Sequence, residues 1–256
     1  MFLHPGPGVD GSVFLPGAER LAATHRVLIV DLPGNGRSAD GDRGEWTLAG
    51  FARAVDGLAG ELGLTGWTLL GHSFGGYVAM QHLVDFPGSA VRVVASCTDA
   101  EEEPPPDAPA DPFADLPEDV AARIREAFDR EATVATAADC REVWTAQMPF
   151  FAGSPDAVPA LREAFADVEY RPEVHHPRDW GDLHALEALA AADIPVLAIA
   201  AELDRPTPPA CARRIAETAP RGELLMIEGA GHFPFVETPD AYWDGLAAWL
   251  ARTEAA

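Results

Sequence analysis

Residues 68–80 read TLLGHSFGGYVAM and raise the question of why a serine lies in so cramped a place. An apolar run ends in a cluster of small residues, and an apolar pattern then resumes at helical spacing. The run before the cluster is typical of a buried strand. Ser73 is therefore predicted in a sharp turn between a strand and a helix, within the pattern Gly71-x-Ser73-x-Gly75.

Such a turn forces the serine into a strained backbone conformation, and side chains two positions before and after it would collide. The turn lifts the hydroxyl out of the sheet and places it at a helix N-terminus. The free N–H of Phe74 can stabilise a developing oxyanion there. A serine at this place can also be a simple helix N-cap, so the motif alone leaves a catalytic and a capping interpretation open.

Strand and helix patterns alternate along most of the chain, which predicts a doubly wound, mostly parallel α/β sheet. Short β-branched or Leu-rich runs predict buried parallel strands at 26–32, 67–71, 91–96, 194–200 and 223–229. Apolar residues at helical spacing predict helices over 47–62, 75–86, 207–218 and 239–251.

The alternation breaks between residues 99 and 182. The proline-rich run EEEPPPDAPADP (101–112) cannot form a regular helix or pair as a β-strand, because proline lacks a backbone N–H donor. Segments 118–131 and 159–168 then carry apolar residues on one helical face. We therefore expect one core built from residues 1–98 and 183–256, with 99–182 as a helical insertion.

Charge and composition exclude several classes of function. The 256 residues carry a formal charge of −23, which would repel a nucleic-acid backbone. Residues 99–182 hold 21 acidic residues and 7 arginines. The three cysteines are widely spaced, which indicates neither a disulfide framework nor a metal site. This cysteine pattern fits a reduced, cytoplasmic setting, and we expect a cytoplasmic protein. No apolar run is long enough to span a bilayer, so we expect no membrane partner.

A serine becomes a good nucleophile only when a histidine takes its proton and an acid orients that histidine. His232 lies in the glycine turn EGAGHFPF after the last predicted strand, which favours it as the base. Asp204 follows the strand 194–200 in a compact turn and is the favoured acid, with Asp99 as the competitor. We expect His175 and His176 at the surface of the insertion.

A second oxyanion donor is expected from a loop after an early strand. The run FLHPGPG (2–8) provides one, because glycine lets the backbone approach a ligand closely, and the N–H of Gly6 is the natural candidate. Proline and glycine are also the commonest turn residues, so a simple turn is the alternative.

These motifs together resemble the α/β-hydrolase superfamily. HPGPG, DLPGNGRS (31–38), GHSFGG, ELDRPTPP and GAGHFPFVETPDAY look like its prolyl iminopeptidase-like and meta-cleavage-hydrolase-like branch. The resemblance implies that residues 99–182 form a cap over the active site. It also implies a serine hydrolase without cofactor or metal, with Ser73, His232 and Asp204 as nucleophile, base and acid.

The bond that is cleaved stays open at this point: an ester, an amide at an N-terminal residue, or a carbon–carbon bond. The substrate is expected to be a small molecule or a short peptide. A non-catalytic binding protein on the same scaffold is the alternative of a different class. Aromatic residues of the insertion suggest a partly apolar substrate pocket, although ordinary packing would explain them equally well; they are Trp144, Phe150, Phe151 and Trp180.

The resemblance further implies strands ahead of the HPGPG loop, whereas this chain opens on MFLH. We therefore expect that the N-terminal strands of the fold are missing and that a longer chain adds a leading hairpin. The run 26–32 would then become an exposed apolar edge in the chain as given.

Overall fold

The computed structural model describes residues 1–175 and 180–254 and contains one six-stranded sheet. All its neighbouring strands are parallel, in the order β2-β1-β3-β4-β5-β6. The predicted doubly wound α/β fold is thus confirmed. The strands are β1 (Phe2–Leu3), β2 (Ile29–Val30), β3 (Thr68–His72), β4 (Arg92–Ser96), β5 (Val196–Ala201) and β6 (Gly222–Ile227).

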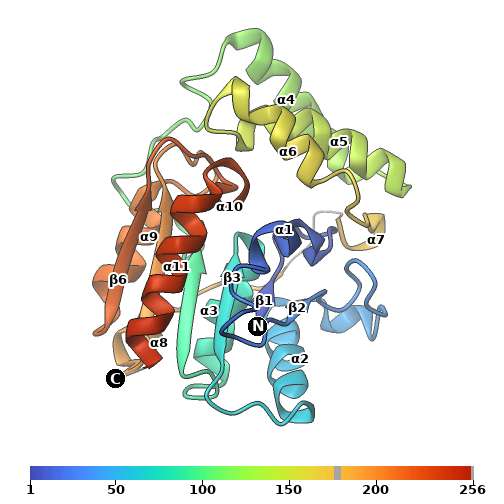
Figure 1. The fold of residues 1–256 in the computed structure, drawn as a ribbon. Coiled ribbons are helices and arrows are strands. Elements are labelled where there is room, and N and C mark those ends of the chain that lie inside the picture. Colours follow the sequence, from blue (N-terminus) through green and yellow to red (C-terminus); the bar gives the residue numbers. More distant parts are fainter. Residues whose placement is uncertain (176–179, 255–256) are drawn as a thin grey trace.

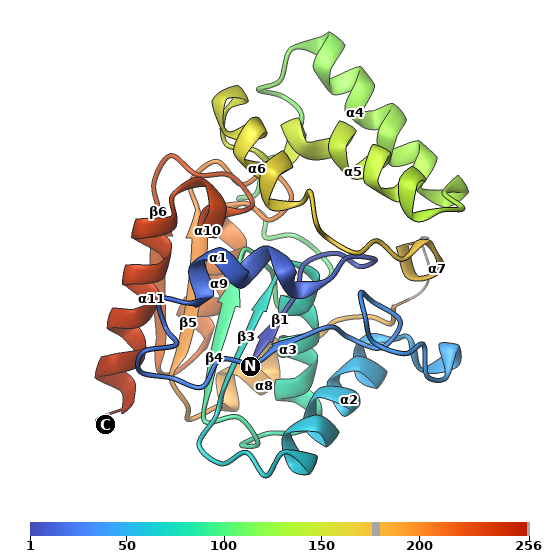
Figure 2. The same ribbon diagram turned by 45° about the vertical axis from the view of Figure 1, so that its right-hand side comes forward.

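Helices cover both faces of the sheet (Figures 1 and 2). On one face lie α2 (Leu48–Glu61), α3 (Phe74–Asp85), α8 (Leu186–Ala191) and α9 (Pro209–Thr218). On the other lie α1 (Leu15–Ala18) and α11 (Pro239–Glu254). The remaining helices are α4 (Glu118–Arg130), α5 (Ala137–Phe151), α6 (Val158–Ala164), α7 (Pro172–His175) and α10 (Pro234–Glu237).

Successive side chains of the central strands point to opposite faces of the sheet, so the core consists of two clusters. In β5, Val196 and Ala198 belong to the cluster with α2, α3, α8 and α9, whereas Leu197 and Ile199 belong to the cluster with α11. All six residues of β5 are buried. A strand that is buried on both faces has a continuous run of apolar residues, which is why this element was recognisable in the sequence.

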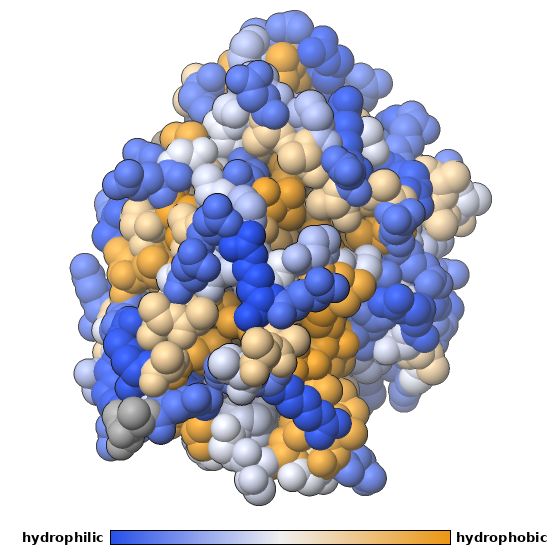
Figure 3. Space-filling view, in the orientation of Figure 1, coloured by the Kyte–Doolittle hydropathy of each residue, from blue (hydrophilic) through white to orange (hydrophobic). Residues whose placement is uncertain are grey.

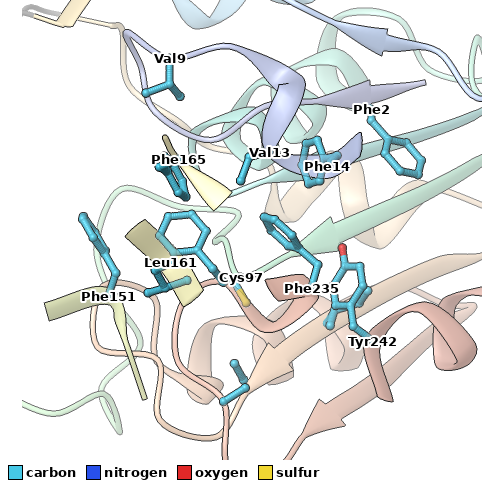
Figure 4. Close-up of a cluster of buried hydrophobic side chains, with 14 of the residues drawn as sticks. Phe2, Val9, Val13, Phe14, Cys97, Phe151, Leu161, Phe165, Phe235 and Tyr242 are labelled. Carbon is cyan, nitrogen blue, oxygen red and sulfur yellow. The ribbon is translucent and has the colours of Figure 1, made fainter. Parts of the chain in front are cut away.

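Helices α4, α5 and α6 lie together beyond one end of the sheet (Figures 1 and 2). They share a core with the sheet, because Leu161 and Phe165 belong to the same buried cluster as Phe14 and Phe235. Figure 4 shows these side chains around Cys97. The helical segment is therefore held by apolar contact as well as by its two chain connections.

The two outer strands are less buried than the sequence predicts. Of the run 26–32 only Ile29–Val30 forms a strand, and both residues are half-buried at the edge of the sheet. In β6, at the other edge, Leu224 is 40% exposed. The expectation that both runs are buried was wrong, because an edge strand lacks a neighbour on one side. The edge at β2 is short, which limits edge-to-edge pairing.

On the face shown in Figure 3, hydrophilic residues dominate the outer rim of the molecule, and apolar residues appear toward its centre. Within the described ranges 1–175 and 180–254, no helix combines the length and the apolar character that a membrane span requires.

Stability is expected to fall in mild acid because of His72, at the end of β3. This side chain is fully buried, and burial lowers the pKa of its imidazole well below the ordinary value. Below about pH 6.5 the unfolded chain therefore binds a proton that the folded chain does not. The free energy of unfolding should fall by at most about 1.4 kcal/mol per pH unit for this one group.

Urea unfolding between about pH 7 and pH 5 checks this expectation. The pH dependence should be weaker in His72→Gln than in the wild type. His184→Gln is the control, because this exposed histidine pairs with Glu101, which raises the pKa of its imidazole. The same slope in His72→Gln and wild type would show that His72 does not cause the acid sensitivity.

Candidate active site

Ser73 lies in the turn between β3 and α3, as predicted, and its backbone is strained. Its φ is +53°, a value uncommon for a residue with a side chain. A Cβ on Gly71 would lie 2.0 Å from the Gly75 carbonyl oxygen, and a Cβ on Gly75 would lie 2.5 Å from that of Leu3. Both positions therefore require glycine. The hydroxyl makes no capping hydrogen bond to α3, which argues against the simple N-cap interpretation.

The structure joins Ser73, His232 and Asp204 in one chain of hydrogen bonds. The Oγ of Ser73 lies 2.9 Å from Nε2 of His232. The Nδ1 of the same ring lies 2.9 and 3.0 Å from the two carboxylate oxygens of Asp204. The side chains of His232 and Asp204 are 2% and 0% exposed, so water competes little for these bonds.

The topology explains why three residues so far apart in sequence meet. Ser73 follows β3, Asp204 follows β5 and His232 follows β6. Because these strands are parallel, their carboxyl ends reach the same edge of the sheet, where α/β folds gather their ligands. A hydroxyl, an imidazole and a carboxylate in this order can transfer a proton away from the hydroxyl and stabilise the imidazolium that forms.

Further groups hold the Asp204 carboxylate. The backbone N–H of Thr207 donates to one of its oxygens at 3.1 Å, and the Thr207 hydroxyl donates to the other at 2.9 Å. The buried thiol of Cys97 also interacts with this carboxylate, and burial raises the pKa of the thiol well above its ordinary value. Besides Ser73, Cys97 is the one non-glycine residue with positive φ in the part of the chain that the structure describes.

Asp99, the competing acid, has other partners. Its carboxylate accepts a hydrogen bond from the N–H of Ala100 at 2.7 Å and pairs with Arg214 at 2.6 Å. The side chain is 5% exposed, so this pair ties α9 to the loop after β4. The geometry therefore favours Asp204 as the partner of His232.

Two pockets open on Ser73, and Gly6 and Pro7 line both of them. The wider pocket, of about 490 Å³, is lined by Phe74, at the start of α3, and by Trp180. The smaller pocket, of about 210 Å³, is lined by His232 and by residues of the helical segment. Gly6 has a φ of +123°, which a residue with a side chain would rarely adopt.

The four aromatic residues expected at the substrate pocket do not all reach it. Trp144 and Phe151 line the smaller pocket, and Trp180 lines the wider one. Phe150 lines neither of these two pockets. Its ring stacks on Phe113 at 4.8 Å and contributes to the packing between helices. Adjacent residues of a helix point in different directions, which the expectation did not take into account.

His175 was expected at the surface and is instead buried, lining the smaller pocket; His176 lies outside the described residues. Glu131 and Gln147 line the same pocket, and Nε2 of Gln147 donates to a Glu131 oxygen at 2.5 Å. Burial raises the pKa of Glu131. The helical segment thus brings hydrogen-bonding groups as well as aromatic rings to the site.

One set of side chains among residues 1–175 and 180–254 has metal-ligand atoms close enough to share an ion. These are Cys97, Asp204 and His232, whose ligand atoms lie within 4.8 Å of one another. His232 and Asp204 are already hydrogen-bonded to each other, so the arrangement is accounted for without an ion.

The sequence reasoning missed two groups that hold the site together. Thr207 follows Asp204 by three residues. An aspartate side chain commonly accepts a hydrogen bond from a backbone N–H a few residues further on, so this spacing was the signal that could have predicted the contact. Glu237, at the end of α10, accepts hydrogen bonds from three backbone N–H groups around His232. One of these lies in the helical segment, a contact that sequence spacing does not reveal.

A parallel sheet with a strained serine in a glycine-framed strand-to-helix turn defines the α/β-hydrolase class. The profile of the alpha/beta hydrolase family matches residues 1–244, and the chain belongs to this family. It is 28% identical to pimeloyl-[acyl-carrier protein] methyl ester esterase of Xanthomonas campestris pv. campestris (strain B100), over 98% of this chain and 94% of that protein. The proteins to which the chain is similar are named esterases and hydrolases, and this chain is a hydrolase.

Solved structures with the same fold include two esterases. A thermophilic esterase from Thermogutta terrifontis has a TM-score of 0.72 and 23% identity, over 98% of this chain and 89% of that one. The esterase RhEst1 from Rhodococcus sp. ECU1013 has a TM-score of 0.75 and 21% identity, over 98% of this chain and 90% of that one. At these identities the likeness concerns the fold.

Proposed function

We propose that the protein is a serine hydrolase that cleaves small carboxylic esters by acyl transfer, with Ser73 as nucleophile, His232 as base and Asp204 as the orienting acid. The observation that carries this proposal is the 2.9 Å contact between Ser73 Oγ and His232 Nε2, with the Asp204 carboxylate on the opposite ring nitrogen. The name of the Xanthomonas relative, a methyl ester esterase, supports an ester as the substrate.

In the first half of the reaction, His232 Nε2 takes the hydroxyl proton while Ser73 Oγ attacks the ester carbonyl carbon. The backbone N–H groups of Phe74 and Gly6 stabilise the oxyanion. The carbon–oxygen bond to the alcohol then breaks, and the alcohol leaves with the proton from His232. In the second half, His232 takes a proton from water as that water attacks the carbonyl carbon of the acyl-enzyme. The bond between this carbon and Ser73 Oγ then breaks, His232 returns the proton to Oγ, and the carboxylic acid leaves.

The two pockets supply separate places for the two parts of an ester. We assign the acyl group to the smaller pocket, because its volume of about 210 Å³ and its aromatic lining fit a short chain. The alcohol part then occupies the wider pocket beside Trp180. In this proposal residues 99–182 act as a cap, since Trp144 and Phe151 of that segment line the acyl pocket.

Cleavage of an N-terminal peptide bond is the second candidate, and Glu131 is the observation that favours it. A carboxylate beside Trp144 in the acyl pocket could bind a substrate ammonium group. Two observations weaken the electrostatic attraction that this requires. Gln147 already donates to Glu131, and burial raises the pKa of the carboxyl, which disfavours its charged form.

A comparison of matched substrates separates the two candidates. We expect hydrolysis of p-nitrophenyl butyrate. The difference in kcat/KM between alanyl p-nitroanilide and its N-acetyl form should be no more than about threefold, because Glu131 already accepts a hydrogen bond from Gln147 and burial disfavours its charged form. Glu131→Gln should change kcat/KM for the butyrate less than about threefold. Preference for the free amine by tenfold or more, lost in Glu131→Gln, would instead establish the peptidase candidate.

A further inference from the structure

The carboxyl end of α5 is bonded directly to the loop that carries His232. The backbone N–H of His232 donates to the carbonyl oxygen of Phe151 at 2.7 Å. The rings of the same two residues lie nearly parallel, with centroids 5.6 Å apart and an interplanar angle of 28°. Because Phe151 also lines the smaller pocket, the wall of that pocket and the imidazole are immediate neighbours.

Glu237 connects the two segments that meet at this contact through one half-buried carboxylate. Its Oε2 accepts hydrogen bonds from the N–H of Gly153 at 2.8 Å and from that of Gly231 at 3.0 Å. Its Oε1 accepts from the N–H of Phe233 at 3.2 Å. The carboxylate therefore holds the residues on both sides of His232 together with Gly153, which lies two residues past the end of α5.

Two glycines make this approach possible. A Cβ on Gly231 would lie 2.2 Å from the nitrogen of Gly153, and a Cβ on Gly153 would lie 2.6 Å from the nitrogen of Gly231. Both distances are far below van der Waals contact. The two backbones can thus share one carboxylate only because neither residue has a side chain.

The loop that carries Asp204 reaches the same end of α5. Arg205 donates from Nη1 to the carbonyl oxygens of Phe150 at 3.2 Å and Ala152 at 2.6 Å. It also pairs with Asp115, at 2.6 Å. The last turn of α5 is therefore hydrogen-bonded to the loops of both His232 and Asp204.

We propose that Glu237 is a positioning residue that couples the wall of the acyl pocket to His232, so that an acyl group that fills the pocket raises kcat as well as lowering KM. This inference rests on the proposed function. Positioning of a base can act on kcat because small displacements of a reacting group cost large factors in rate. A purely structural role for Glu237 would affect all esters equally.

The test uses Glu237→Gln, which keeps the shape but replaces one acceptor oxygen by an NH2 group that would face a backbone donor. With p-nitrophenyl butyrate we expect kcat to fall about 10- to 30-fold and KM to change less than about twofold. The ratio of kcat for butyrate to kcat for acetate should fall toward one.

Glu202→Gln is the matched control. The Glu202 carboxylate also accepts a backbone hydrogen bond in the loop after β6, from the N–H of Gly229 at 2.9 Å, but it is exposed and makes no hydrogen bond to α5 within the described residues. We expect wild-type kcat within about twofold. Circular dichroism and Tm show whether each variant folds, and Glu237→Asp, which retracts the carboxylate, replaces Glu237→Gln if the latter does not fold.

A double-mutant cycle with Phe151→Leu decides whether Glu237 couples the pocket wall to His232 or only stabilises the loop in general. In the wild-type background Phe151→Leu should lower kcat for butyrate about fivefold or more, and in the Glu237→Gln background less than about twofold. Additive effects, or an unchanged ratio of butyrate to acetate, would overturn the coupling. Unreduced turnover in Ser73→Ala would instead overturn the proposed function, and the inference with it.

Discussion

Replacing Ser73 with alanine is expected to lower kcat for p-nitrophenyl butyrate by roughly 10⁴-fold or more, with Tm close to that of the wild type. The change removes one oxygen that makes no bond to the helix behind it, so the fold loses little. The reaction loses its nucleophile, and only the backbone donors and substrate binding remain. Steady-state kinetics and thermal unfolding on the same preparations measure both quantities.

Ser89→Ala is the control for Ser73→Ala. The Ser89 hydroxyl follows the far end of α3 and donates to Asp56 at 2.6 Å, away from the site. This variant should keep wild-type kcat within about twofold. A Ser73→Ala variant that is as active as Ser89→Ala would remove Ser73 from the mechanism.

The second large effect is expected at Asp204. Asp204→Asn should lower kcat by roughly 10³- to 10⁴-fold, because an amide favours the wrong tautomer of His232. The hydrogen bonds around Asp204 support its assignment as the acid. Its carboxylate also accepts two hydrogen bonds from Thr207, which hold it in one orientation toward His232.

Asp99→Asn is the paired comparison. It weakens the bond to Arg214 and should lower Tm, but we expect kcat to change less than about fivefold, since Asp99 has no bond to His232. Kinetics of the two variants side by side decide the assignment. If Asp99→Asn is the severely impaired variant, Asp204 is not the acid.

The strand-to-helix turn at Ser73 was predictable because its requirements are local. Backbone atoms leave no space for a Cβ at Gly71 or Gly75, so the sequence of the turn reflects its geometry directly. The central strands were also predictable, since burial on both faces leaves a continuous apolar run, as in β5. The outer strands carry similar runs, and their exposure depends on sheet order, which a strand's own residues do not encode.

The site was predictable only in part, for the same reason. His232 and Asp204 could be selected because each follows a recognisable strand in a short loop. Glu237 could not, because its partner Gly153 is 84 residues away and the contact depends on how α5 meets the sheet. The burial of His175 and the position of Phe150 outside the two pockets likewise depend on packing between helices, which hydrophobic pattern alone does not determine.

Covalent labelling with a fluorophosphonate, followed by proteolysis and mass spectrometry, tests whether Ser73 is an activated nucleophile. We expect one adduct per chain, on the peptide that contains GHSFGG, and loss of esterase activity in proportion to labelling. Asp204→Asn should be labelled much more slowly than wild type, and Ser73→Ala should not be labelled. An unlabelled wild-type protein that still hydrolyses esters, or an adduct on a different residue, would contradict Ser73 as the nucleophile.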